Sequence, residues 1–140
     1  AEACIPLDWK YSVQDSRADY AVLDGATETH HSCPKDFLEN ENQESLSRFS
    51  DILLLGHDWK EDEERLLGIL SEGYTGRLGV IGSKSKWKAF TNVALEAGIS
   101  QETLDGVNCP IGLAIGAESP EEIAIAVLAE ILAAHKGINV

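Results

Sequence analysis

Two short, uninterrupted apolar runs stand out in the pattern of hydrophobic and polar positions along the chain. Residues 51–56 read Asp-Ile-Leu-Leu-Leu-Gly, and residues 78–82 read Leu-Gly-Val-Ile-Gly. Runs of this length that end in glycine are typical of strands buried on both faces of a parallel sheet. A shorter strand is predicted for residues 11–14, and a strand or extended segment for residues 107–115.

Segments with helical periodicity separate and follow these runs. Helices are predicted for residues 61–70, 85–97 and 120–135, with one further turn at residues 100–104. The last helix has a complete start signal: Ser119 as N-cap, Pro120 as first helical residue and Glu122 as the reciprocal member of a capping box. The order of elements predicts an α/β fold, namely a three-layer, Rossmann-like parallel sheet with helices on both faces.

Residues 16–50 are more polar and less regular than the rest of the chain. Short helices are predicted for residues 34–39 and 44–49, joined by a hydrophilic linker, and His30 and His31 are expected on the surface. We found no internal repeat. The length of 140 residues fits one domain over residues 1–140.

The charge balance narrows the classes of partner. With 24 acidic and 11 basic residues, the net charge is −13, which argues against binding to nucleic acid or to an anionic membrane surface. No apolar run approaches the roughly 20 residues that span a bilayer, and no signal segment is recognisable at the start. The three cysteines are widely spaced and odd in number, which fits free thiols and a cytoplasmic location.

The loop after the second apolar run is the best candidate for an anion site. It consists of Gly82, Ser83, Lys84, Ser85 and Lys86. Backbone N–H groups, two hydroxyls and two ammonium groups would meet there at the N-terminus of a helix. The alternative is a plain solvated turn, because cations at the start of a helix oppose its dipole unless an anion is present.

Polar residues also follow the other two strands, where open parallel sheets bind ligands. Asp15 either bonds a ribose hydroxyl, as the acid at this position of a dinucleotide-binding fold does, or caps the turn at the end of the strand. Arg17 either pairs with a phosphate or neutralises Asp15. His57 and Asp58 follow the strand at 51–56. With Asp62 they could contribute to a divalent metal site, but the simpler interpretation makes Asp58 the N-cap of the next helix. We assign no metal ligand and no catalytic residue.

The segment before the last helix contains two glycines. Gly112 and Gly116 would let the backbone approach a nucleotide or another anionic ligand closely, or they serve only a tight connection. Cys109 precedes them, and we interpret it as a small buried thiol rather than a reactive one.

Several of these motifs occur together in a known family. The resemblance is carried by His57-Asp58, Tyr74, and residues 81–86, 95–99, 110–117, 119–124 and 129–131. In this order they resemble the C-terminal domain of the XdhC/CoxI family, accessory factors for xanthine dehydrogenase and related molybdenum hydroxylases. The resemblance covers residues 51–135, and Val13-Gln14-Asp15-Ser16-Arg17 is similar to the ending of the family's second strand.

The resemblance implies a Rossmann-type fold and a role in maturing molybdenum hydroxylases. Family members are understood to bind molybdenum cofactor, a pterin that carries a phosphate, and to hand it to the apo-enzyme. We infer that residues 82–86 would be a natural place for that phosphate, with Asp15, Arg17, His57, Asp58, Gly112 and Gly116 as further binding candidates.

The sequence departs from the family pattern in two ways. The family's N-terminal domain is not recognisable, and residues 1–7 read as the tail of the first helix, so the first strand and its glycine turn are missing. That strand is central in the usual order. Either the remaining strands close the gap or another chain supplies a partner, and we expect a homodimer. Without the glycine turn, NAD(P) binding is doubtful. The alternatives to a maturation factor are an NAD(P)-binding, oxidoreductase-like protein and a truncated interaction module with no ligand.

Overall fold

The computed structural model describes Cys4 and residues 7–139. The predicted helix tail at residues 1–7 therefore lies mostly outside the described residues. In chain order the elements are β1 (Val13–Asp15), the 3-10 helix η2 (Ala18–Tyr20), β2 (Thr29–His31), α1 (Pro34–Glu39), α2 (Gln43–Leu46), β3 (Asp51–Leu54), α3 (Trp59–Ser71), β4 (Arg77–Val80), α4 (Lys84–Glu96), α5 (Gln101–Asp105) and α6 (Pro120–His135).

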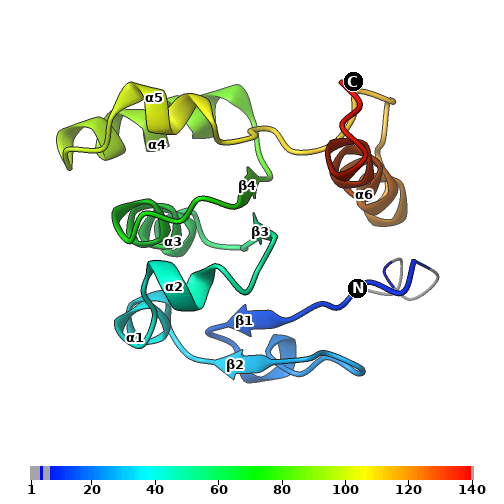
Figure 1. Cartoon of the computed structure of the whole chain (residues 1–140), viewed down its shortest axis with the longest axis horizontal. Helices are drawn as coiled ribbons and strands as arrows, with labels where there is room; N and C mark the ends of the chain where they lie inside the picture. Colours follow the sequence, from blue (N-terminus) through cyan, green and yellow to red (C-terminus); the bar gives the residue numbers. More distant parts are fainter. Residues whose placement is uncertain (1–3, 5–6, 140) are drawn as a thin grey trace.

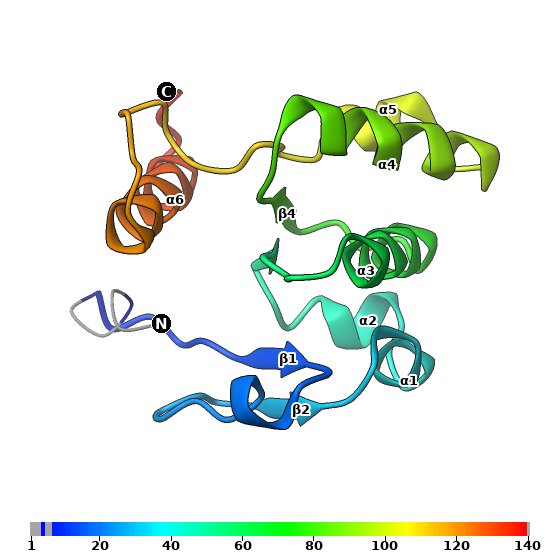
Figure 2. The same cartoon turned by 180° about the vertical axis from the view of Figure 1, so that it is seen from behind.

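The elements form three layers. Figures 1 and 2 both show α6 on one side of the strands and α1, α2, α3 and α4 on the other. All four strands are parallel to their partners, with Val13 opposite Thr29 and Asp51 opposite Arg77. The predicted Rossmann-like α/β architecture is thus confirmed. The sheet, however, consists of two separate pairs, β1 with β2 and β3 with β4.

β3 lies between the two helical layers. Ile52 packs against the larger core cluster, which contains Leu66 of α3 and Phe90 of α4. Leu53 packs against the smaller cluster, which contains Val127 of α6. Because consecutive side chains of a strand point to opposite faces, a continuous apolar run is what such a doubly covered strand requires.

The segment at residues 107–115 is extended and forms one isolated bridge rather than a strand. Asn108 N–H donates to the Leu78 carbonyl (2.9 Å), and Ile111 N–H donates to the Val80 carbonyl (3.0 Å). The ladder cannot continue regularly because Pro110 has no N–H to donate. Gly112 then takes a positive φ of 116° and turns the chain toward α6. The expected alternative of an extended segment is the correct one.

Other boundaries differ from the prediction in the polar region. The strand β2 was not predicted, because its Thr-His-His sequence lacks an apolar pattern. It contains His30, which is half-buried, and His31, which is exposed as expected. The second short helix ends at Leu46 instead of residue 49. Helix α3 begins at Trp59, two residues earlier than predicted, because the Asp58 side chain caps it.

The start of α6 follows the sequence signal closely. The Ser119 hydroxyl accepts the Glu122 N–H (3.1 Å), and the Glu122 carboxylate accepts the N–H groups of Glu118 (2.9 Å) and Ser119 (3.3 Å). This reciprocal arrangement satisfies donors that the first turn of a helix leaves without partners. The predicted capping box is confirmed.

We expect Ser119→Ala to lower the free energy of unfolding by about 1 kcal/mol, because the cap of α6 loses its acceptor. Ser85→Ala is the matched control, since Ser85 is exposed in the first turn of α4 and is not its cap. Urea denaturation of the two variants and the parent measures the difference. Equal losses in both variants would contradict a stabilising role for the box.

Candidate functional site

Side-chain hydrogen bonds connect the carboxyl end of β1 to α3, the helix that follows β3. The Ser16 hydroxyl, just after β1, donates to the Glu61 carboxylate in the first turn of α3 (3.2 Å). One helical turn further, the Arg65 guanidinium donates to the Gln14 side-chain oxygen (2.9 Å). The predicted candidates Asp15 and Arg17 are thereby brought to the same edge as His57 and Asp58. In open parallel sheets this edge is where ligands bind.

Asp15 and Arg17 form a closed pair. The Asp15 carboxylate accepts the Arg17 backbone N–H (2.9 Å) and two guanidinium N–H groups (both 3.1 Å). The guanidinium also stacks on the Tyr20 ring, 3.6 Å from its centroid. The hydrogen bond from the Arg17 side chain lowers the pKa of Asp15. Of the two roles considered for Arg17, the structure favours neutralisation of Asp15.

A buried carboxylate joins the ends of β3 and β4. Asp62 of α3 is 0% exposed. It accepts hydrogen bonds from the Gly56 backbone N–H (3.1 Å), from Arg65 (2.8 Å) and from the Lys86 ammonium (3.2 Å). A Cβ at Gly56 would collide with the Asp62 carboxylate, so only glycine fits at this turn. These hydrogen bonds are made within the protein, so the residues of the network support the site rather than bind a ligand.

The Asp62 network engages one of the two ammonium groups that were expected to face a ligand at the predicted anion loop. Lys86 is only 4% exposed, and its ammonium also donates to the Ile81 carbonyl (3.0 Å). It therefore points into the protein, and the expectation that both loop ammonium groups face a ligand is wrong for Lys86. Lys84 and Ser85 are exposed, and the Ser83 hydroxyl caps α4 by accepting the Lys86 N–H (3.2 Å). The anion site itself stays a prediction.

His57, Asp58 and Glu61 lie around the N-terminus of α3. One ligand atom of each lies within 4.8 Å of the others, so together they could hold a divalent cation. Asp58 is already engaged as N-cap, accepting the N–H groups of Lys60 (2.8 Å) and Glu61 (3.3 Å). The predicted cap is confirmed. A cation at this position would oppose the helix dipole.

Gly112 and Gly116 do not share a hydrogen bond with these strand ends in the part of the chain that is described. A Cβ on Gly112 would lie 3.5 Å from Ala126 and Val127, so Gly112 sits directly against α6. Gly116 has open space around it and a φ of 76°. Both glycines shape the connection to α6, which favours the tight-connection interpretation. Burial raises the pKa of the Cys109 thiol, as expected for a structural cysteine.

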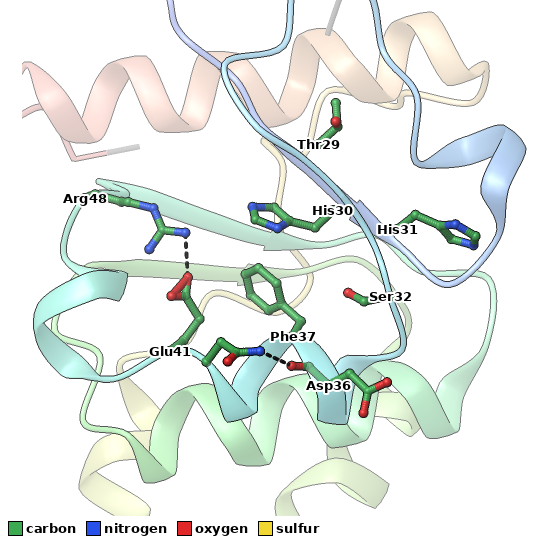
Figure 3. Close-up of a pocket in the computed structure, with 9 residues that line it drawn as sticks. Thr29, His30, His31, Ser32, Asp36, Phe37, Glu41 and Arg48 are labelled. Carbon is green, nitrogen blue, oxygen red and sulfur yellow. Dashed lines mark hydrogen bonds and ion pairs between the residues drawn. The ribbon is translucent and has the colours of Figure 1, made fainter.

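A cavity of about 550 Å³ opens beside β2 and α1. Figure 3 shows His30 next to the Phe37 ring in the middle of the view, with Arg48 and Glu41 to their left. The His30 and Phe37 ring centroids are 4.9 Å apart. Arg48 pairs with Glu41 and also with Glu28, with 2.9 Å between Arg48 Nε and Glu28 Oε2. Of the residues that line the cavity, His30, Glu41 and Arg48 are thus already engaged in ion pairs within the protein.

The sequence argument missed the central role of Asp62 and Arg65. A signal was present, because Asp62, Leu66 and Ile69 are spaced i, i+4 and i+7 and lie on one helical face. An acid on an otherwise apolar face predicts a buried ion pair. Its partner Lys86 could not be deduced, since the two residues are joined only by the packing of α3 on α4.

We expect Asp62→Asn to lower the free energy of unfolding by about 3–5 kcal/mol, because the buried Lys86 ammonium loses its counter-charge. The double variant Asp62→Asn/Lys86→Met should recover part of that loss. Glu64→Gln on the exposed face of α3 is the control and should change stability by less than about 0.5 kcal/mol. Chemical denaturation measures all three. An unchanged midpoint for Asp62→Asn would refute the buried pair.

The ion pairs of Glu28 predict a pH dependence. Hydrogen bonds from Arg48 first, and from His30 second, lower the pKa of Glu28 to about 2. A depressed folded-state pKa stabilises the fold above the unfolded-state pKa, and that contribution disappears as the pH falls from about 4.5 toward 2. Glu28→Gln should therefore destabilise the chain at pH 6 and cost progressively less below pH 4.5.

Denaturation curves at fixed pH values test this expectation. Glu44→Gln, at an exposed position of α2, serves as the control because it should give a small difference at every pH. A penalty for Glu28→Gln that is the same at pH 6 and at pH 3 would contradict the assignment.

None of the helices in the described residues is both long enough and apolar enough to cross a membrane.

Comparison with known proteins connects this arrangement to one family. The chain resembles the uncharacterized protein YqeB of Escherichia coli (strain K12), with 46% identity over 55 residues, which are 39% of this chain and 10% of that protein. The fold of this chain is similar to a solved structure of a xanthine dehydrogenase from Bacillus halodurans, with a TM-score of 0.78 and 22% identity. That match covers 99% of this chain and 39% of the other. The chain thus spans well under half the length of either relative. The model of the XdhC Rossmann domain matches residues 1–131, so the chain belongs to the family of XdhC Rossmann domains.

Proposed function

We propose that this chain is an accessory factor in the maturation of a molybdenum hydroxylase of the xanthine dehydrogenase type. It would bind molybdenum cofactor, or a related ligand that carries a phosphate, rather than catalyse a reaction of its own. Membership of the XdhC Rossmann family supports the link to xanthine dehydrogenase. The name of the structural neighbour from Bacillus halodurans points in the same direction. The partner would be the apo-enzyme, which this chain would bind in the cytoplasm.

The exposed N-terminus of α4 is the observation that carries the ligand proposal. The first N–H groups of a helix lack partners within the helix and attract anions. Lys84 and Ser85 are exposed there, in a chain whose net charge is −13. The buried Asp62–Lys86 pair anchors the turn from beneath (3.2 Å). A rigid turn with one outward cation suits a phosphate better than a solvated loop would.

The residues present fit the phosphate end of the pterin. Lys84, the Ser85 hydroxyl and the first N–H groups of α4 would hold it. Gly82, just before them, has a positive φ of 146°, which other residues rarely adopt. The bound group would supply the molybdenum centre that the apo-enzyme needs. The work of this chain would be to hold the phosphate and to release the group at the partner's surface.

A nucleotide-dependent oxidoreductase is less well supported. Both oxygens of Asp15 accept hydrogen bonds from Arg17, so the carboxylate expected to bind a ribose hydroxyl is already engaged. Fold alone does not assign such an activity.

Lys84→Ala should weaken the binding of molybdopterin about tenfold, because one charge-assisted hydrogen bond to the phosphate is lost. Lys88→Ala is the matched control, since Lys88 is an exposed lysine one turn further along α4. Calorimetric titration of both variants and the parent gives the comparison, with NAD as a second titrant. Equal affinities for the parent and Lys84→Ala would reject the site, and tighter binding of NAD would favour the nucleotide alternative.

We further propose that the isolated chain forms a homodimer, because β1 and β3 each have an unpaired edge in the described structure. Native mass spectrometry at low micromolar concentration distinguishes a dimer from a monomer. A monomer at every concentration would contradict the proposal.

A further inference from the structure

Trp59, the first residue of α3, carries a large aromatic ring that the fold leaves open. The residue is 53% exposed, although tryptophan is on average a well-buried residue type. It belongs to neither of the two core clusters. The cap of α3 is made by Asp58, so the ring has no part in starting the helix. Neither burial nor capping accounts for an indole at this position.

The indole ring is held in one orientation against α4. Its centroid lies 6.2 Å from that of the Phe90 ring, and the two ring planes are nearly perpendicular, at 77°. The Lys86 ammonium lies 6.0 Å from the same indole centroid. Phe90 and Lys86 are both buried, so the indole rests on parts of the protein that packing already fixes. A ring positioned in advance loses little conformational freedom when a ligand packs on it.

Trp59 lies beside the start of α4, where the phosphate is proposed to bind. Figures 1 and 2 both show α3 and α4 next to each other, and these helices follow the paired strands β3 and β4. The buried pair of Asp62 and Lys86 joins the first turns of the two helices (3.2 Å). Lys84, two residues before Lys86, is exposed at the first position of α4. The open indole and the outward ammonium therefore border the same part of the surface.

The charges around the indole favour an anionic ligand. The Asp58 carboxylate accepts two backbone N–H groups of α3, and the Glu61 carboxylate accepts the Ser16 hydroxyl. These acids are thus engaged within the protein, whereas Lys60, the neighbour of Trp59 in the chain, is exposed like Lys84. Flat nitrogen heterocycles stack on aromatic side chains, and cations nearby attract the phosphate that such a ring carries. A ligand with both features matches this surface better than a phosphate alone.

We infer that Trp59 is the stacking surface for the flat nitrogen heterocycle of a ligand whose phosphate binds at the start of α4. This inference rests on the proposed phosphate site and adds to it the chemical class of the ligand. A pterin and a nucleobase share the required chemistry, because each presents a planar face. Inorganic phosphate and sugar phosphates lack the ring and would bind without the help of Trp59.

Calorimetric titrations with molybdopterin, AMP and inorganic phosphate test the inference. Trp59→Leu should weaken the binding of molybdopterin roughly tenfold, or that of AMP if the ligand is a nucleotide, and leave the affinity for inorganic phosphate unchanged. Trp59→Phe keeps a ring and should lose no more than about threefold. Tyr20→Leu is the matched control, because Tyr20 is an aromatic residue that is 60% exposed on another loop, and it should bind like the parent. Circular dichroism melts confirm that the variants fold.

NMR of the indole N–H groups observes the ring directly. The chain has three tryptophans, and the signal that disappears in Trp59→Phe is that of Trp59. The probe 6-hydroxymethylpterin, which has the ring without a phosphate, should shift this signal more than those of Trp9 and Trp87. Inorganic phosphate should leave it in place.

The results separate the stacking surface from the phosphate site. Unchanged affinities in Trp59→Leu, with weaker phosphate binding in Lys84→Ala, would overturn the stacking inference and leave the phosphate site standing. Weaker binding of the heterocyclic ligand in Trp59→Leu alone would support the stacking surface and reject the phosphate site. Equal losses in Trp59→Leu and Tyr20→Leu would overturn the inference, and so would a parent chain that binds neither molybdopterin nor AMP.

Discussion

The buried carboxylate of Asp62 is the interaction on which the arrangement of the strand ends depends. It bonds the turn after β3 through Gly56 and the start of α4 through Lys86. Through Arg65, which also bonds Gln14, it connects to β1. Each charge is costly to bury alone, but the set satisfies its members, and a satisfied buried network fixes one geometry. One side chain of α3 thus positions the carboxyl ends of three strands.

The need for such a network follows from the interruption of the sheet. In a continuous parallel sheet, the backbone ladder would fix β1 relative to β3, and the side chains at the strand ends would be free for ligands. Here, among the described strands, backbone hydrogen bonds join only β1 to β2 and β3 to β4, so side-chain hydrogen bonds position β1 relative to β3. These bonds are Ser16–Glu61 and Gln14–Arg65. Two groups that the sequence suggested for binding are also engaged within the protein, Lys86 with Asp62 and Arg17 with Asp15. What remains outward at the anion loop is Lys84 with Ser85.

Much of the fold could be predicted because local patterns determine it. The apolar runs identified β3 and β4, and Ser119, Asp58 and Pro120 marked helix starts whose bonds form within a few residues. β2 could not be predicted from Thr-His-His, since its pairing with β1 comes from a partner 16 positions away. The inward orientation of the Lys86 side chain likewise depends on the carboxylate of Asp62, 24 residues earlier in the chain. Local signals can be recognised in the sequence, whereas the contact partners of residues far apart in the chain depend on how the elements pack.

The same reasoning explains where the ligand-binding edge of the strands lies. Ligands of parallel sheets bind where neighbouring strands diverge toward opposite sides, because the loops after those strands leave a crevice there. In this chain that place lies between β1 and β3, where Ser16 meets Glu61.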